Sequence, residues 1–434
     1  MSGGAFDPVQ RVFAPDSVGT TVRLRGWLSK SRSSGGILFL LLRDRTASVQ
    51  VTGKRDVLGD AAFDAATHVQ VEGVVAIEGT VHADPRAPGQ REVRAAKITV
   101  LHAGEPFPIL ADQTEEFRLD NRHLVIRSAD HVATFRVKAE VLRALREFLD
   151  EEDVLETTPP ILSGNAAEGG AEAFQIDYFG RPGYLSQTAQ LYLEALLVPN
   201  ERVYALTPSF RAEKSRTPRH MTEYQHLEVE LAWCDLAEML AFEERMVVSV
   251  CHAVAERRPR ELTQLGRPPA ELLAIEAPFP RLRYAEAIDR LAAQGFPVQW
   301  GSDLATAEER ALTIESPTPI FVTHFPKELK AFYMLRSDDD PRTVEAADLL
   351  APEGYGEMIG GSCRETDLHR LTERLHETGA PVAEYEWYLD LRRHGSVPHA
   401  GFGLGVERIL RWMLRLEHIR EATPFPRTPS RHTP

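Results

Sequence analysis

Residues 203–233 (VYALTPSFRAEKSRTPRHMTEYQHLEVELAW) alternate apolar and polar positions on both sides of a polar segment. A period of two is typical of half-buried strands, so this stretch predicts a long antiparallel hairpin. The segment between the two strands holds five basic side chains: Arg211, Lys214, Arg216, Arg219 and His220. Guanidinium groups bind phosphoryl oxygens bidentately, which suits a polyphosphate ligand. A solvated basic turn is the alternative, although Glu213 and Glu223 among the cations disfavour it.

Short strand-like runs also fill the region between residues 18 and 104. They cover 21–30, 36–44, 47–52, 68–81 and 92–103. Five such runs in under a hundred residues predict a small barrel, for which the OB-fold is the best candidate. Barrels of this kind bind single-stranded nucleic acid by stacking bases on aromatic side chains beside cations. Trp27 and Phe39 are the aromatic candidates; the pattern alone favours a core position for both.

Helical periodicity follows between residues 132 and 149, and VLETTPPIL (154–162) reads as a strand. Residues 105–127 mix proline, acidic and polar residues without a clear period, which indicates a hinge between domains. The Gly-rich stretch SGNAAEGGAEAF (163–174), which carries Glu168, reads as a loop. Residues 234–320 contain helical runs and no recognisable chemistry.

The composition indicates an ordinary globular protein of 434 residues, with 43% hydrophobic and 26% charged residues. No apolar run approaches the roughly 18 residues of a membrane span, and the first residues lack a signal-peptide pattern. Three widely spaced cysteines suit a reducing cytosol and offer no zinc cluster. A formal charge of −14 argues against a nucleic-acid partner, but RNA contact needs only a local basic face.

Two carboxylates near the C-terminal third are candidate metal ligands. Asp348 and Glu357 flank a turn, so both can reach one point in a folded sheet, and Mg²⁺ prefers carboxylates together with phosphate oxygens. The acidic run at 338–340 is better explained as a solvated turn.

The segments FRAE and RHMTEY (210–213 and 219–224) resemble motif 2 of the class II aminoacyl-tRNA synthetases, in the aspartate, asparagine and lysine subgroup. The helix, strand and Pro160 resemble motif 1, and GFGLGVER (401–408) resembles motif 3. The resemblance covers nearly the whole chain, with the motifs in the right order. It implies an α+β protein: an OB-fold anticodon-binding domain (1–104), the hinge (105–127) and an antiparallel catalytic domain (128–434). It also implies ATP, Mg²⁺ and tRNA as ligands, a homodimer, and a cytoplasmic location.

The same resemblance implies a set of site residues. For ATP they are Arg211, Glu213, Arg219, His220, Tyr224 and Arg408. For the amino acid they are Glu168, Gln190, Glu228, Arg364 and Arg392. For the anticodon they are Arg32, Phe39 and Gln50, and for magnesium Asp348 and Glu357.

The amino acid itself is read from three positions, because aspartate and asparagine differ only in charge and hydrogen-bond polarity. Aspartate-specific members carry a lysine where this chain has Leu193 and an aspartate where it has Glu228, which can accept from an amide. They have an aromatic residue in place of Arg392, which can donate to the amide oxygen. These features favour asparagine, while Gln225, His226 and the ending TPSRHTP leave an aspartate-specific or non-discriminating archaeal-type enzyme as the alternative.

Two further alternatives are less favoured. An amidating ligase on the same scaffold would typically lack the barrel at 18–104. An RNA-binding or regulatory relative with a decayed site would not be expected to keep Arg211, Glu357 and Arg408.

Overall fold

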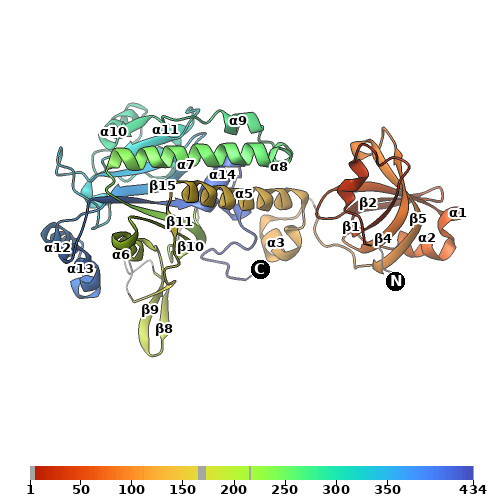
Figure 1. Ribbon diagram of the computed structural model, residues 1–434, viewed down its shortest axis with the longest axis horizontal. Coiled ribbons are helices and arrows are strands. Elements are labelled where there is room, and N and C mark those ends of the chain that lie inside the picture. Colours follow the sequence, from red (N-terminus) through yellow and green to blue (C-terminus); the bar gives the residue numbers. More distant parts are fainter. Residues whose placement is uncertain (1–4, 111, 165–172, 215–216, 434) are drawn as a thin grey trace. The chain divides into compact units, whose positions relative to one another are not determined.

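The computed structural model describes residues 5–110, 112–164, 173–214 and 217–433. The chain divides into two compact units, Met1–Gln113 and Thr114–Pro434 (Figure 1). The second unit begins with two short helices, α3 (Glu115–Asp120) and α4 (Arg122–Val125).

The first unit is a closed barrel with the strand order β1-β2-β3-β5-β4. Its strands and the two helices between β3 and β4 are β1 (Thr21–Ser34), β2 (Ile37–Arg43), β3 (Ser48–Lys54), α1 (Arg55–Leu58), α2 (Asp60–Thr67), β4 (Val74–Ala83) and β5 (Arg91–His102). Alternate residues face inward, so Leu38 and Leu40 of β2 are fully buried while Phe39 between them lies only half-buried on the outer face. The barrel predicted from the alternation is confirmed.

The expectation that Trp27 belongs to the barrel core is wrong. Trp27 is 44% exposed, whereas its neighbour Leu28 is fully buried. The inward positions of β1 are the even-numbered residues up to Leu28, so the indole falls on the outer face. There the Arg43 guanidinium carbon lies 5.6 Å from the centroid of the Trp27 ring.

The second unit is built on an eight-stranded sheet with the order β12-β13-β14-β15-β16-β11-β10-β6. Its strands are β6 (Leu155–Glu156), β10 (Arg202–Phe210), β11 (Glu223–Ala232), β12 (Arg281–Arg283), β13 (Ile320–Thr323), β14 (Ala346–Ala351), β15 (Gly356–Cys363) and β16 (His399–Gly405). The predicted hairpin is the antiparallel pair β10–β11, which lies beside β16. A separate small sheet has the order β7-β9-β8, formed by β7 (Leu162–Ser163), β8 (Gln175–Tyr178) and β9 (Arg181–Leu185).

Two long helices, α5 (Ala129–Glu151) and α7 (Leu236–Arg257), lie side by side over one face of the large sheet (Figure 1). Their apolar side chains form one core with Leu227, Val229 and Leu231 of β11. Because side chains alternate across a strand, the residues between these three face the opposite side of the sheet. That opposite face carries the polar site described below.

The strand predicted at 154–162 is only partly present. In its place the structure has two strands of two residues each, β6 and β7, which are separated by Thr157–Ile161. Pro159 and Pro160 lack the backbone N–H that a strand ladder needs, so the pairing cannot continue through them.

The remaining helices are α6 (Gln190–Asn200), α8 (Pro259–Gln264), α9 (Pro269–Leu273), α10 (Tyr284–Ala293), α11 (Thr306–Thr313), α12 (Leu368–Glu377), α13 (Glu386–Arg393) and α14 (Val406–Met413). Within the described ranges, no helix combines the length and apolar character that crossing a membrane requires.

Candidate active site

The polar face of the central hairpin is set by strand alternation. His226, Glu228 and Glu230 of β11 point away from the helix-covered core and lie next to β16, where Glu228 pairs with Gly403 and Glu230 with Gly401. A Cβ atom at Gly401 would lie 2.2 Å from a Glu230 carboxylate oxygen, and one at Gly403 would lie 2.4 Å from Nε2 of His226. The two glycines are therefore required so that these side chains can lie across the neighbouring strand.

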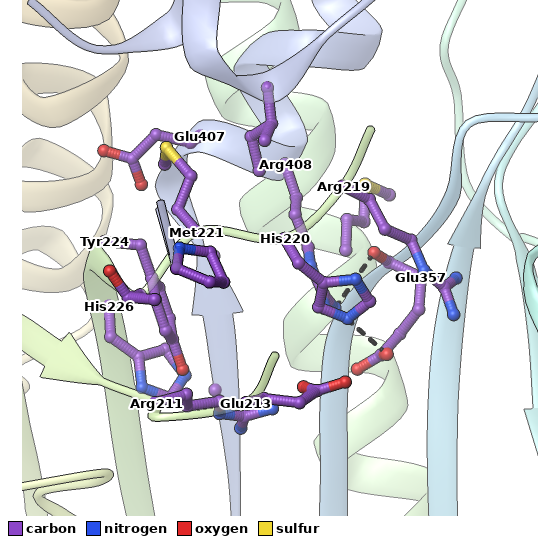
Figure 2. A pocket seen from close by; sticks show the side chains of 16 residues that line it. Arg211, Glu213, Arg219, His220, Met221, Tyr224, His226, Glu357, Glu407 and Arg408 are labelled. Atoms are coloured by element: carbon purple, nitrogen blue, oxygen red, sulfur yellow. Dashed lines mark hydrogen bonds and ion pairs between the residues drawn. The ribbon is translucent and has the colours of Figure 1, made fainter. Parts of the chain in front are cut away.

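A smaller cavity opens beside this face and contains the six side chains predicted for ATP. Figure 2 shows Tyr224 and His226 along one side and Arg219 and Glu357 along the other. The described residues that line it are Arg211, Glu213, Arg219, His220, Met221, Thr222, Tyr224, His226, Glu357, Met358, Gly403, Gly405, Glu407, Arg408, Ile419 and Pro429. They come from β11, β15, β16, α14 and the loops next to these elements, so the fold brings together residues that lie more than two hundred positions apart.

The guanidinium groups of this cavity are held by acids and aromatic rings. Nη1 of Arg408 lies 3.0 Å from a carboxylate oxygen of Glu357 and donates to the Glu357 backbone carbonyl at 3.3 Å (Figure 2). The Arg211 guanidinium carbon lies 5.8 Å from the ring centroid of Tyr224. The cavity thus presents fixed cations suited to an anionic ligand.

His220 differs from the arginines because it is not a cation at neutral pH. Burial, together with the positive charge of Arg408, lowers the pKa of His220 to about 4. Its Nδ1 is paired with the Thr217 hydroxyl. A neutral imidazole contributes a hydrogen bond rather than a charge, so the phosphate-binding charge in this cavity comes from arginine.

The two predicted metal ligands converge over one glycine. A Cβ atom at Gly360 would lie 3.2 Å from a Glu357 carboxylate oxygen and 3.6 Å from an Asp348 carboxylate oxygen. Burial raises the pKa of Asp348 to about 6, and Nζ of Lys330 donates to its carboxylate at 2.7 and 2.8 Å. Although burial opposes it, the charge of Arg408 lowers the pKa of Glu357 to about 2. Two hard oxygen donors over a bare backbone position fit Mg²⁺ that takes its other ligands from phosphate and water.

A larger cavity shares Arg211, Arg219, His226, Glu357 and Gly403 with the smaller one. Its other lining residues include Tyr184, Thr188, Gln190, Glu228, Glu230, Glu309, Lys330, Tyr333, Asp348, Gly360, Arg364 and Phe402. Of the residues predicted for the amino acid, Gln190, Glu228 and Arg364 line this cavity. Glu168 lies outside the described residues.

The carboxylate of Glu228 is fixed by two donors from the turn before α6. It accepts from the Thr188 hydroxyl and from the backbone N–H of Ala189 at 2.7 Å. Arg364 donates to the carboxylate of Glu230 and, through Nη1, to the Ser362 hydroxyl at 2.7 Å. Nδ1 of His226 also lies 3.4 Å from the Glu228 carboxylate. The cavity therefore offers one carboxylate and, beside it, one guanidinium that is shared with a second carboxylate.

Arg392 is not among the described residues that line the larger cavity. Its guanidinium is buried and donates through Nη2 to Glu194 at 2.7 Å and through Nε to the backbone carbonyl of Glu365 at 2.9 Å. Leu193 packs in a separate apolar cluster with residues of β10.

In the first unit, the residues predicted for the anticodon share the outer face of three neighbouring strands. Arg32 pairs with Phe39 across β1 and β2, and its guanidinium carbon lies 4.6 Å from the ring centroid. Gln50 of β3 is half-buried, and its amide donates to Glu92 at 3.4 Å. A half-buried aromatic ring on the outer face beside a guanidinium suits base stacking.

Several site residues were missed by the sequence analysis. Glu309 holds Arg219, Lys330 holds Asp348, and Glu194 holds Arg392. Glu309 and Lys330 lie in segments without a motif, so no local pattern identifies them. Glu194 follows Gln190 by one helical turn, and that spacing was the one available signal.

Comparison with known proteins identifies the class. Residues 114–429 match the family "tRNA synthetases class II (D, K and N)", and residues 22–101 match "OB-fold nucleic acid binding domain". The chain therefore belongs to the class II aminoacyl-tRNA synthetases of this subgroup, which confirms the predicted family and fold.

Individual relatives point to one branch of that family. The asparagine–tRNA ligase of Thermococcus kodakarensis is 49% identical over 421 residues, 97% of each chain. The crystal structure of asparaginyl-tRNA synthetase from Pyrococcus horikoshii complexed with asparaginyl-adenylate has a TM-score of 0.96 at 48% identity, covering 99% of this chain and 100% of that one. The aspartyl-tRNA synthetase from Entamoeba histolytica has a TM-score of 0.87 at 26% identity, covering 100% of this chain and 93% of that one.

Proposed function

We propose that this chain is an asparagine–tRNA ligase. It activates asparagine with ATP to give asparaginyl-adenylate and pyrophosphate, and then transfers the asparaginyl group to the terminal ribose of tRNA. The observation that carries this proposal is the junction of two cavities at Arg211 and Glu357, one lined by arginines and the other by amide- and carboxylate-binding side chains. A nucleotide in the first and an amino acid in the second would meet at that junction.

On the nucleotide side, Arg211 and Arg219 bind phosphate oxygens while Arg408 stacks on the base. The attacking group is the carboxylate of the substrate, so no protein nucleophile is needed and catalysis consists of positioning and charge stabilisation. Arg211 and Arg219 also line the amino-acid cavity, so they can stabilise charge on the α-phosphate as the new bond forms. Glu213, His220 and Tyr224 complete the cavity wall.

Magnesium is the proposed metal, held by Asp348 and Glu357 together with phosphate oxygens. When bound, it neutralises charge on the phosphates. Lys330 and Arg408 already pair with these carboxylates, so they keep the two acids ionised and oriented toward the junction.

On the amino-acid side, Gln190 is proposed to bind the α-amino end and Glu228 to accept from the side-chain NH₂. The amide oxygen was assigned to Arg392 from the sequence, but Arg364 is the arginine of the two that lines the cavity, so Arg364 is proposed to donate to this oxygen instead. A substrate carboxylate in place of the amide would meet Glu228 as a like charge, which disfavours aspartate. Glu168 is proposed to close over the amino acid as part of a lid.

The barrel is proposed to bind the tRNA anticodon, with Phe39 as a stacking platform, Arg32 beside it and Gln50 reading a base edge. Two copies of the chain are proposed to form a homodimer through the motif 1 segment. Three apolar side chains of that segment support this proposal: Leu155, Ile161 and Leu162 are 52%, 37% and 48% exposed. Exposed apolar side chains that are grouped, rather than scattered singly, indicate an interaction surface. The reduced state of Cys234, Cys251 and Cys363 suits the cytoplasm.

The experiment that tests this proposal is ATP–pyrophosphate exchange with asparagine and aspartate in parallel. We expect exchange with asparagine and little with aspartate at concentrations that saturate asparagine. Preferential exchange with aspartate would replace the proposal by the aspartate-specific alternative. Exchange with neither amino acid would favour the non-catalytic alternative.

A further inference from the structure

A buried carboxylate lies directly behind the amino-acid cavity. Glu194 of α6 accepts from Nη2 of Arg392 at 2.7 Å, from the Tyr388 hydroxyl at 2.7 Å and from Nε2 of His399 at 3.1 Å. Its other oxygen accepts from the amide of Gln190 at 3.1 Å, and Gln190 lines the cavity. We call these five residues the Glu194 cluster. It connects the wall of the amino-acid cavity to an arginine outside it.

The cluster is a closed arrangement of charges. The side chains of Glu194 and Arg392 are each only 1% exposed. Despite burial, the charges of Arg392 and His399 hold the pKa of Glu194 well below its usual range, so the carboxylate is ionised. The Arg392 guanidinium is fixed further by the Tyr388 hydroxyl, 2.9 Å from Nη2. Glu194 therefore neutralises Arg392 and fixes its direction.

The cluster is not suited to a metal ion. Ligand atoms of Glu194, Glu230 and His399 lie within 4.8 Å of one another. Both carboxylates, however, already accept from guanidinium groups, Glu194 from Arg392 and Glu230 from Arg364. A cation there would have to displace an arginine from each, and the side chains of these two ion pairs are at most 4% exposed. The pairs of Asp348 and Glu357 differ because their side chains are 18–31% exposed. The ion pairs of the cluster therefore need an explanation other than metal binding.

The charge balance of the cavity gives that explanation. Arg364 is compensated by Glu230, whereas Glu228 accepts from a hydroxyl and a backbone N–H and has Nδ1 of His226 3.4 Å away. If Arg392 were unpaired, its positive charge would favour an anionic substrate in the cavity, because charges attract each other more strongly inside a protein than in water. Its pairing with Glu194 removes that possibility.

We propose that Glu194 is a specificity-determining positioning residue: by pairing with Arg392 it keeps that guanidinium from adding an unpaired positive charge beside the amino-acid cavity, and so excludes aspartate. This inference rests on the proposed function, and it assigns the discrimination to a residue that does not itself touch the substrate. A purely structural ion pair is the alternative, in which case its loss would harm both amino acids alike.

The test is a double-mutant cycle on amino-acid activation, with kcat/KM for asparagine and for aspartate measured for each protein. Glu194→Gln leaves Arg392 unpaired, and we expect the asparagine-to-aspartate ratio to fall about tenfold or more, through a rise for aspartate. In the double variant Glu194→Gln with Arg392→Gln the unpaired guanidinium is gone as well, and the ratio should return to within about threefold of the parent. Glu194→Asp keeps the charge and should keep aspartate excluded, even with a raised KM for asparagine.

The outcomes separate the two proposals. A parent that prefers aspartate refutes the proposed function itself. A parent that prefers asparagine, with an unchanged ratio in Glu194→Gln or a parallel loss of both substrates, refutes only the role of Glu194. If Glu194→Gln does not fold, the remaining variants decide: acceptance of aspartate by the neutral double variant or by Glu194→Asp overturns the inference.

Discussion

The carboxylate of Glu309 on α11 holds the guanidinium of Arg219, which lines both cavities of the active site. The same carboxylate oxygen accepts from the backbone N–H of Glu357 at 2.9 Å. Burial raises the pKa of Glu309 to about 7, against the attraction of Arg219. One buried acid thus fixes a phosphate-binding arginine relative to the strand that carries a proposed metal ligand.

Glu309→Ala should therefore raise the KM for ATP about tenfold, because Arg219 loses the charge-assisted hydrogen bond that orients it. The KM for asparagine should stay within about twofold of the parent. Exchange measured at varied ATP and at varied asparagine separates the two effects. Glu308→Ala, on the same helix but outside both cavities, is the matched control. An equal rise in both KM values would show that Glu309 supports the site as a whole.

Glu228→Gln should damage asparagine use far more than it damages folding. One of the two donors that hold the carboxylate would then face an NH₂ group, so the side chain can no longer accept from the substrate amide in the same orientation. The exclusion of aspartate should relax because the like charge disappears. A change of about 3 kcal/mol in the preference for asparagine over aspartate would change the ratio of the two kcat/KM values more than a hundredfold. Glu223→Gln, at an exposed position of the same strand, is the control. Equal losses of activity with asparagine and with aspartate in Glu228→Gln would mean that Glu228 does not recognise the substrate side chain.

Phe39→Ala should weaken tRNA charging and leave amino-acid activation without tRNA unchanged. Loss of base stacking costs roughly 1–3 kcal/mol, which corresponds to about 5- to 150-fold in kcat/KM for tRNA. Phe39 is half-buried and lies against Arg32, so its removal opens no core cavity. Val57→Ala, at an exposed apolar position in the same unit, should leave both activities intact. A fall in both activities together with the melting temperature would mean that Phe39 acts in packing.

Glu243 of α7 is a buried acid, and neither of its carboxylate oxygens has a hydrogen-bond partner within the described part of the chain. Burial, reinforced by the charge of Asp348, raises the pKa of Glu243 well above its ordinary value of 4.5. Below pH 4.5 the folded and unfolded states both carry the proton. As the pH rises further, the unfolded state releases it first, so this group makes the free energy of unfolding fall with pH until its folded pKa is reached.

Glu243→Gln removes that dependence, and its stability relative to the parent should increase from pH 5 to pH 8. Each unit by which the folded pKa is raised corresponds to about 1.4 kcal/mol at pH values above it. Denaturant midpoints at the two pH values measure the difference, with Glu256→Gln at an exposed position of the same helix as the control. A parent-to-variant difference that does not change with pH would mean that Glu243 is ionised in the folded protein.

The sequence predicts features that rest on local periodicity or on a motif. The β10–β11 hairpin, the barrel and α5 belong to this group. Arg211, Arg219 and Arg408 were predicted from motifs, and the structure brings them together around one cavity. Trp27 was wrongly predicted to lie in the core because indole side chains are usually buried. Its position in the alternation of β1 places it on the outer face instead. Glu194 and Glu309 could not be found, because their roles arise from contacts with partners brought close only by the fold.

Gly401 and Gly403 of β16 couple the substitutions that β16 can accept to the side chains present on β11. Since a methyl group at either position would occupy the space of a β11 side chain, neither glycine can change unless Glu230 or His226 shrinks at the same step. Shortening Glu230 would in turn leave the buried guanidinium of Arg364 without the carboxylate that it pairs with. Mutational routes to a new amino-acid preference that add a side chain on β16 must therefore change both strands together.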